Sequence, residues 1–418
     1  MDYKKIKGTN DFFDENSKKF RYVEQNVRKI IESYDFNEII TPIFEGTEVF
    51  VRSAGETSDI VNKEMYTFKD KGDTSLTLRP EGTAGVVRSY VENKMYAQPG
   101  LKKLYYIGPM FRSEKPQAGR FRQFHQFGIE VFGEGNYLLD AEVIGSAYNI
   151  FEALGIKNVK LVINSIGDME SRQNYAKILQ EYFKDHLDSL CDDCKKRFLK
   201  NPMRILDCKV DKNNPVLINA PKIYDNLTEE SKLYFSKLLN ALEKLGIDYR
   251  VDHNLVRGLD YYTDTVFEYI IEDNSEISGL AICAGGKYAD LIRSFGGPDV
   301  PGVGYAFGVE RIISIMDNQG LFKDNQKTKV TLITLDEESK IYGMSLAKKL
   351  RQEFIVNMDY KNNNLKPQFK LSDRSQSDYV IIIGEEERLN NEVTVKNAKT
   401  AEQNKIKVDQ IISYIKGE

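Results

Sequence analysis

Two segments rich in aromatic and β-branched residues constrain the fold more than any other part of this sequence. They span 103–112 and 121–132, and the loop between them reads Ser-Glu-Lys-Pro-Gln-Ala-Gly from Ser113 to Gly119. Two strand-like runs around a loop that contains Pro and Gly are typical of paired antiparallel strands. The sequence therefore predicts a long hairpin with an extended tip.

Helices and shorter strands are predicted on both sides of this hairpin. Residues 17–34 place apolar side chains at spacings of three and four, which indicates an amphipathic helix. The remaining predicted elements of this part are a strand from Glu38 to Thr41 stopped by Pro42, a helix over 138–154, a mainly helical insertion over about 170–246, strands over 247–252, 259–271 and 277–283, a Gly-rich run over 295–304, and a helix from 308.

A second domain is predicted after the polar stretch Asp317–Thr328, which has the composition of a linker. Beyond it the pattern alternates between strands and helices as far as the unbroken apolar run Val380–Ile383. Such alternation favours a small α/β domain with central strands buried on both faces. We therefore expect two domains, 1–325 with the insertion and 326–418.

Composition excludes several classes of protein. The chain has 418 residues, with 59 Lys plus Arg against 63 Asp plus Glu, so its total charge does not indicate a strongly basic nucleic-acid binder. With 41% hydrophobic and 29% charged residues it has the composition of an ordinary globular protein. No apolar run has the length of a membrane span and the first residues lack the core of a signal peptide, so we expect a cytoplasmic protein without a membrane partner.

The four cysteines fit a reducing compartment rather than a disulfide framework. Cys191 and Cys194 form a C-x-x-C, the nearest further cysteine is Cys208, and no pair of histidines completes a tetrahedral metal site. Free thiols in a helical region are the favoured interpretation, and no structural zinc is expected.

One face of the second hairpin strand could carry a binding site. Alternation along a strand places Arg122, Phe124, Gln126 and Glu130 on the same face, while the opposite face is more apolar. A polar face of this kind can simply meet solvent, or it can meet a ligand, and both interpretations stay open at this point. The chain lacks the G-x-x-x-x-G-K-[ST] pattern of the usual P-loop.

Basic residues gather locally despite the balanced total. From Lys102 to Arg122 there are six bases and one acid, and from Lys348 to Arg374 there are seven bases and three acids. Such runs are usually solvated surface, but arginine also offers a bidentate fork to phosphate oxygens. A triphosphate or an RNA end would suit the first run, and a nucleic-acid face would suit the second.

The motifs together resemble those of class II aminoacyl-tRNA synthetases in their histidyl form. The second signature motif is similar to Tyr106–Gln126, the first to the strand that ends at Pro42, and the third to Gly304–Arg311. Two segments peculiar to the histidyl family are similar to Leu255–Tyr262 and Ala284–Tyr288. The resemblance covers nearly the whole chain and implies an α+β catalytic core, with an antiparallel sheet flanked by helices. It also implies a helical insertion and a C-terminal α/β anticodon-binding domain.

The resemblance implies an ATP-dependent ligase that forms histidyl-adenylate and transfers histidine to the 3′ end of tRNA(His). ATP, with Mg²⁺, would be a substrate, and the family is homodimeric. Residues that would bind ATP are Arg112, Glu114, Arg120 and Arg311. Arg257 and Arg112 would be catalytic, with Arg257 bridging the histidine carboxylate and the α-phosphate.

For histidine, the resemblance assigns the α-ammonium group to Glu81, Thr83 and Gln126, and the imidazole nitrogens to Glu130 and Tyr262, with Tyr288 closing the pocket. Gln117 and Arg122 would contact the acceptor end of the tRNA. The chain departs from the family pattern at Lys115, where a second arginine is usual, and at Ala118, where lysine is common. The alternative function is an inactive regulatory paralogue of histidine biosynthesis, but its sequences typically lack the C-terminal domain and intact copies of the two histidyl segments.

Overall fold

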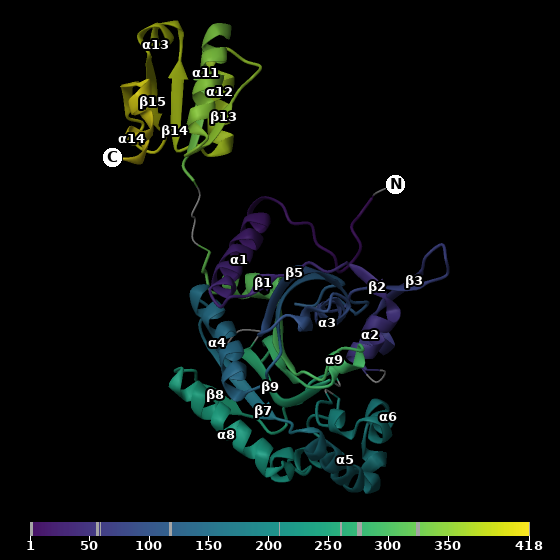
Figure 1. Cartoon of the computed structure of the whole chain (residues 1–418). Coiled ribbons are helices and arrows are strands. Elements are labelled where there is room, and N and C mark those ends of the chain that lie inside the picture. Colours follow the sequence, from purple (N-terminus) through teal and green to yellow (C-terminus); the bar gives the residue numbers. More distant parts are fainter. Residues whose placement is uncertain are drawn as a thin grey trace. The chain divides into compact units, whose positions relative to one another are not determined.

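The computed structural model separates into two compact units, residues 1–322 and 323–418 (Figure 1). It describes residues 3–55, 58, 60–116, 119–208, 210–259, 261–273, 278–322 and 327–417. In these residues no helix is both long and apolar enough to cross a membrane.

The predicted hairpin is confirmed and lies in the main sheet of the first unit. Strands β5 (Lys102–Phe111) and β6 (Gln123–Phe132) pair antiparallel from Lys102 opposite Phe132 to Phe111 opposite Gln123. The eight-stranded sheet has the order β1-β5-β6-β11-β10-β9-β7-β8. Only its outermost pairs, β1 with β5 and β7 with β8, are parallel among the described strands. The other strands are β1 (Asn37–Glu38), β7 (Val159–Ser165), β8 (Tyr249–Val251), β9 (Tyr262–Ile271), β10 (Ala281–Tyr288) and β11 (Gly302–Gly308).

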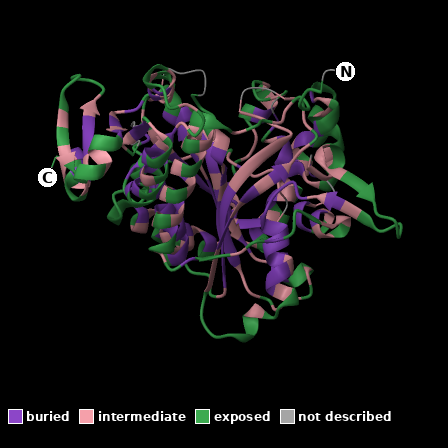
Figure 2. Cartoon of the chain, turned by 90° about the horizontal axis from the view of Figure 1, so that it is seen from above, coloured by how far each residue is buried: buried purple, intermediate pink, exposed green. Residues whose placement is uncertain are grey.

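Four helices cover one face of this sheet and form the largest core with it. They are α1 (Asp14–Glu32), α4 (Tyr137–Ala153), α8 (Glu229–Lys244) and α10 (Val309–Asn318). Helix α1 buries Val23, Val27 and Ile31, which are four residues apart and so share one face. The strand side chains Phe127 and Ile129 are fully buried against these helices, and Figure 2 shows the strands as the most buried part of the unit. The sheet is therefore a rigid platform whose other face is free to carry a site.

A small sheet and three short helices lie beside this platform. The sheet has the order β2-β4-β3, with β2 (Phe44–Gly46), β3 (Tyr66–Lys69) and β4 (Ser75–Leu78). The helices are α2 (Thr47–Ala54), α3 (Thr83–Glu92) and α9 (Leu291–Ser294). Helix α3 packs Val86, Val87 and Tyr90 against Tyr106 and Phe132 of the hairpin. The turn between β4 and α3, residues 79–82, is thereby fixed at the hairpin.

The helical insertion has a core of its own. It contains α5 (Met169–Phe183), α6 (Asp192–Lys200), α7 (Pro215–Ile218) and short 3₁₀ turns. Tyr175, Leu179 and Phe183 of α5 pack with Cys194 and Ile205 in a separate buried cluster. Helix α8, by contrast, packs Phe235, Leu238 and Leu242 into the core of the main sheet.

The C-terminal unit is the predicted α/β domain. Its sheet has the order β13-β12-β14-β15-β16, in which β12 pairs parallel with β13 and β14 while the last two pairings are antiparallel. The strands are β12 (Lys329–Thr334), β13 (Ile355–Met358), β14 (Tyr379–Ile383), β15 (Glu392–Asn397) and β16 (Gln403–Lys407). The helices are α11 (Glu337–Leu350), α12 (Leu365–Ser375), α13 (Glu385–Asn390) and α14 (Ile411–Lys416). The predicted fold class, an antiparallel α+β core followed by an α/β domain, is confirmed.

Candidate active site

A cavity of about 580 Å³ opens on the face of the main sheet that the four helices leave uncovered. Its size is that of a pocket for a small molecule of a few hundred daltons. The residues that line it come mostly from the β4–α3 turn, the hairpin, the loop before β9, strands β10 and β11, the start of α10, and the helical insertion. They include eleven of the predicted site residues: Glu81, Thr83, Arg112, Glu114, Arg120, Gln126, Glu130, Arg257, Tyr262, Tyr288 and Arg311.

The alternating face of strand β6 is directed into this cavity. Phe124, Gln126 and Glu130 line it, while Phe127 and Ile129 on the opposite face are buried in the core. Of the two interpretations that the sequence left open, a solvent face and a ligand face, the structure favours the ligand face.

One end of the cavity holds buried carboxylates. The Thr83 hydroxyl donates to Glu130 Oε1 at 2.6 Å, and the Tyr288 hydroxyl donates to Glu130 Oε2 at 2.6 Å. Glu81 accepts the backbone N–H groups of Thr83 and Ala84 at 2.6 and 2.9 Å, at the N-terminus of α3. These hydrogen bonds fix both carboxyl groups in position.

Burial changes the protonation of these groups. Burial raises the pKa of the Glu130 carboxyl to about 8, although the hydrogen bonds from Thr83 and Tyr288 act in the opposite direction, and the nearby Glu81 adds to the rise. Burial also raises the pKa of Glu81. Without a cationic group beside it, Glu130 is therefore largely protonated at neutral pH, and a cationic ligand group would restore its charge.

Several buried polar atoms at this end lack a hydrogen-bond partner among the described residues. They are the Tyr106 hydroxyl, Gln126 Oε1 and Arg257 Nε. Leaving a buried polar group without a hydrogen bond costs about 1–3 kcal/mol. Three such groups in one cavity are typical of a site that binds a polar ligand.

Gly304 leaves space for the carboxyl group of Glu130. A Cβ at this position would lie 2.3 Å from Glu130 Oε2 and 2.2 Å from the Ile129 carbonyl oxygen on the neighbouring strand. Both distances are far below van der Waals contact, so only glycine allows β11 to pack this closely beside Glu130.

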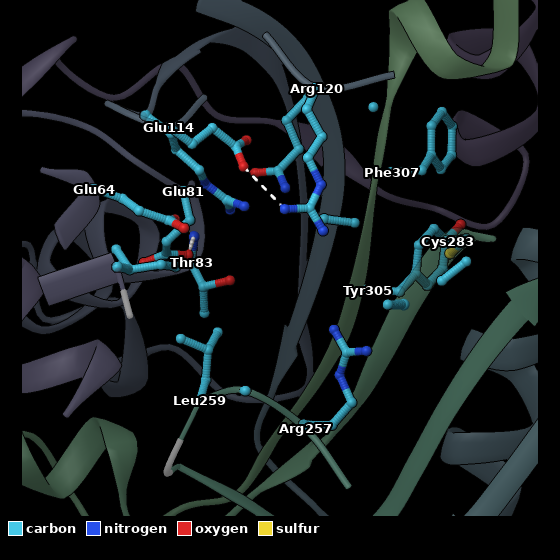
Figure 3. Close-up of a pocket in the computed structure, with 18 of the residues that line it drawn as sticks. Glu64, Glu81, Thr83, Glu114, Arg120, Arg257, Leu259, Cys283, Tyr305 and Phe307 are labelled. Carbon is cyan, nitrogen blue, oxygen red and sulfur yellow. Dashed lines mark hydrogen bonds and ion pairs between the residues drawn. The ribbon is translucent and has the colours of Figure 1, made fainter. Parts of the chain in front are cut away.

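Arg257 reaches the cavity from the loop that precedes β9. Figure 3 shows its side chain directed into the space between Thr83 on one side and Tyr305 on the other. Its guanidinium forms an ion pair with Glu268 of β9 and lies over the Tyr262 ring, 5.8 Å from the ring centroid. Burial raises the pKa of Glu268, and the charge of Arg257 opposes that rise. Arg257 is thus a half-buried cation held in place by Glu268.

The other end of the cavity is rich in arginine. Arg120 forms an ion pair with Glu114 at 3.2 Å, drawn as a dashed line in Figure 3. Arg112 donates from Nε to the Pro80 carbonyl at 2.9 Å and lies over the Phe124 ring, while Arg311 donates to the carbonyls of Gly119 and Ala281. Burial and the charge of Arg120 hold the pKa of Arg311 below its usual range. Three guanidinium groups against one carboxylate can bind an anion with several negative charges.

Of the two predicted tRNA contacts, the structure describes only Arg122. Arg122 donates from Nε to the Glu114 carbonyl at 3.3 Å and does not line the cavity. Gln117 and Ala118 lie outside the described residues.

Sequence reasoning assigned no role to several residues that the structure places at the site. Tyr106, Tyr261 and Glu268 are the clearest: the first two line the cavity, and the third holds Arg257. Glu268 had a usable signal, since it is one of only two acids, with Asp264, in the otherwise apolar and hydroxyl-rich strand β9. The two tyrosines had no signal beyond their place in the quoted motifs.

Known proteins match this chain over its whole length. The family model of histidyl-tRNA synthetase matches residues 8–312, and that of the anticodon binding domain matches residues 329–418. The histidine–tRNA ligase of Anoxybacillus flavithermus is 46% identical over 100% of this chain and 99% of its own. The chain belongs to the histidyl-tRNA synthetase family.

A second ligase and a solved structure agree with this membership. The histidine–tRNA ligase of Staphylococcus haemolyticus is 46% identical over 98% of this chain and 97% of its own. The crystal structure of apo histidyl-tRNA synthetase from S. aureus has a TM-score of 0.84 at 41% identity, and the match covers 99% of this chain and all of that one. The predicted aminoacyl-tRNA ligase is thereby confirmed, and the regulatory alternative is not favoured. As a member of this family the chain uses ATP as a substrate.

Proposed function

We propose that this synthetase activates L-histidine with ATP in the cavity and transfers it to the 3′ end of tRNA(His). The observation that carries the proposal is the division of one cavity into two ends of opposite charge. Glu81 and Glu130 lie beside the N-terminus of α3, and Arg120 and Arg311 lie beside Glu114 and Gly119. Arg112 lies between the two groups, and Arg257 reaches in from the loop before β9. An amino acid fits the first end and a triphosphate the second.

At the acidic end, we assign the α-ammonium group of histidine to Glu81, Thr83 and Gln126. The imidazole nitrogens go to Glu130 and Tyr262, with Tyr288 closing the pocket. Gln126 Oε1 has an open acceptor position for such a ligand among the described residues. A site that hydrogen-bonds both ring nitrogens rejects apolar isosteres, because they would leave its own polar groups unpaired.

At the basic end, Arg112 binds the α-phosphate, Arg311 the γ-phosphate, Arg120 the outer phosphates, and Glu114 lies near the adenine. ATP enters with Mg²⁺, for which phosphate oxygens supply the hard ligands it prefers. The histidine carboxylate attacks the α-phosphorus, the bond to the β-phosphate bridging oxygen breaks, and pyrophosphate leaves. Arg257 bridges the carboxylate and the α-phosphate and stabilises the charge that develops there.

In the second step, the terminal ribose hydroxyl of the tRNA attacks the activated carbonyl and AMP leaves. We propose that Gln117 and Arg122, which follow β5 in the sequence and precede β6, contact the acceptor end. The C-terminal unit, 323–418, would bind the anticodon, since the family model that matches residues 329–418 is that of an anticodon binding domain.

We also propose that the chain acts as a homodimer in the cytoplasm. Ile40, Ile43 and Phe44 flank Pro42 and are exposed, with 84%, 45% and 52% of their surface accessible. Large apolar side chains gathered at one place on a surface are typical of an interface with another protein. Analytical ultracentrifugation of Ile40→Lys against the unchanged chain would test this assignment.

The test of the proposed activity is ATP–pyrophosphate exchange with each of the twenty amino acids. Exchange with histidine alone is the expected result. Exchange with a different amino acid would contradict the assignment of the acidic end. A lack of exchange with every amino acid would favour the alternative function, that of an inactive regulatory paralogue.

A further inference from the structure

Three cysteines and one aspartate converge in the helical insertion. The sulfur atoms of Cys191, Cys194 and Cys208 and a carboxylate oxygen of Asp211 all lie within 4.8 Å of one another. The interpretation of these cysteines from the sequence rested on the lack of a fourth ligand. That interpretation considered only histidine as the missing ligand, and the structure brings a carboxylate to the three sulfur atoms.

The spacing of the ligand atoms is that of a tetrahedral metal site. Cys191 Sγ lies 3.6 Å from Cys208 Sγ, and Cys208 Sγ lies 3.7 Å from Asp211 Oδ2. Four ligands at the Zn–S distance of about 2.3 Å are separated from one another by about 3.8 Å. A disulfide would instead bring two sulfur atoms to about 2.05 Å. These two distances match those between ligand atoms around a common ion.

Local structure brings the three sulfur atoms and the Asp211 carboxylate together. Cys191 is the N-cap of α6 and Cys194 lies in the first turn of that helix, so the C-x-x-C turns both sulfurs to the same side. The second pair follows the 3₁₀ turn Pro202–Ile205, where the Asp211 N–H points to Cys208 Sγ at 3.4 Å. The Cys191 N–H donates to Asp211 Oδ2 at 2.9 Å and ties the two segments together.

Hydrogen bonds and burial around the cluster suit a bound metal. The Asp211 N–H donates to Cys208 Sγ, and such a hydrogen bond orients a ligand atom toward the ion. Cys194 and Cys208 are 0% and 5% exposed, among Leu190, Met203 and Ile205. An apolar shell that excludes water protects thiolate ligands from exchange.

We propose that Cys191, Cys194, Cys208 and Asp211 bind one Zn²⁺ ion that fixes the insertion beside the active site. Three thiolates and a carboxylate are a ligand set that zinc accepts in tetrahedral geometry. The ion joins the start of α6 to the segment 206–211. Cys191, Asp207 and Cys208 also line the catalytic cavity, and the charge of Asp207 acts on Arg257. The proposal is independent of the amino acid that the enzyme activates.

The test is elemental analysis of the full-length chain, purified without a metal-affinity step. One zinc per chain is expected, and X-ray absorption should give about three sulfur ligands near 2.3 Å and one lighter ligand near 2.0 Å. Less than a tenth of a zinc per chain after growth with added zinc would overturn the proposal. A disulfide between Cys191 and Cys208, or iron in place of zinc, would overturn it as well.

Variants separate a metal site from buried thiols. Cys194→Ser should lose the zinc and lower the unfolding temperature, while Cys283→Ser, a buried cysteine of β10 outside the cluster, should keep one zinc per chain. If Cys194→Ser does not fold, Asp211→Ala serves instead, because it leaves the three thiols and should speed zinc release to a chelator at least tenfold. An unchanged release rate in Asp211→Ala together with full zinc in Cys194→Ser would contradict the assigned ligands.

Discussion

At the scale of single residues, the site depends on carboxyl groups whose charge is costly to bury. Glu130 is 2% exposed and receives hydrogen bonds from Thr83 and Tyr288 in the described structure. A ligand that supplies further hydrogen-bond donors and a positive charge would therefore stabilise the charged form of the Glu130 carboxyl group. The selectivity for histidine should reside at this carboxyl group.

Replacing Glu130 should weaken histidine binding far more than ATP binding. Glu130→Gln keeps the size of the side chain and removes its charge, and loss of a charge-assisted hydrogen bond costs about 1.5–3 kcal/mol, or roughly 10- to 100-fold in affinity. Isothermal titration calorimetry with each ligand separately measures this. Equal losses for histidine and ATP would place Glu130 in a structural role instead.

The raised pKa of Glu130 also predicts how stability depends on pH. Because the folded protein holds this proton up to about pH 8 while the unfolded chain releases it near 4.5, the folded state binds more protons in that window. Its contribution to stability is fully present below pH 4.5 and is lost as pH rises through 8. The free energy of unfolding should therefore fall over this range by an amount on the order of a few kcal/mol.

Glu130→Gln is the control for that titration. Chemical denaturation from pH 5 to 8.5 should show a flatter profile for the variant than for the unchanged chain, in the absence of histidine. Parallel profiles would mean that Glu130 does not titrate in this range.

At the scale of elements, close packing of β11 against β6 shapes the cavity beside Glu130, where we propose that histidine binds. Gly304→Ala would place a methyl group 2.3 Å from Glu130 Oε2. We expect this variant to raise the KM for histidine at least tenfold, because either the carboxylate or the strand must move. Gly46→Ala is the matched control, since its added Cβ meets no atom within 4 Å and should leave KM unchanged. Similar KM values for the two variants would refute the argument.

Sequence patterns predicted the elements that repeat a simple period. The hairpin, helix α1 and the C-terminal α/β alternation were found because their buried faces follow periods of two or 3.6 residues. Strand β10 was expected over 277–283 but extends from Ala281 to Tyr288. Its second half contains Gly285 and Gly286, where any side chain would collide with β11 and β9. Glycines carry no hydrophobic signal, so periodicity misses strands that need close contact.

Most of the candidate site was predicted through motifs, and the rest depends on distance in the fold. Arg257 and Glu268 are eleven residues apart, and Asp211 meets Cys191 across twenty residues. Neither pairing follows from local spacing, since each depends on how a loop folds back onto an element. Resemblance supplied Arg257 because it belongs to a motif, whereas nothing in the sequence singled out Asp211.

At the scale of the whole molecule, the two basic runs have different structural contexts. Lys102 and Lys103 lie at the far end of the ten-residue strand β5 from Arg112, which is about 30 Å away, and Lys103 forms an ion pair with Glu142. The first run is therefore not one continuous surface. All seven bases of the second run are exposed, and none of them forms an ion pair with a carboxylate among the described residues: Lys348, Lys349, Arg351, Lys361, Lys366, Lys370 and Arg374.

This difference predicts which step is sensitive to salt. The rate of aminoacylation should fall steeply with added salt, because tRNA binding releases counterions. The rate of pyrophosphate exchange, which needs no tRNA, should change little. Lys366→Glu with Lys370→Glu should raise the KM for tRNA at least tenfold and leave exchange unchanged. Lys405→Glu, at a lysine that forms an ion pair with Glu386 on another part of the domain, is the control. If Lys405→Glu raises the KM for tRNA by the same factor, helix α12 is not the specific contact with the tRNA.

The most direct test of the account is the rate of histidyl-adenylate formation in a single turnover of Arg257→Ala. Loss of a preorganised group that stabilises developing charge typically costs on the order of 100- to 1000-fold in rate. Arg250→Ala removes a guanidinium that forms an ion pair with Glu272 at a more exposed part of the same sheet, and it should react at the rate of the unchanged chain. A folded Arg257→Ala protein that forms the adenylate 100- to 1000-fold more slowly is the predicted result. A rate close to that of Arg250→Ala would contradict it.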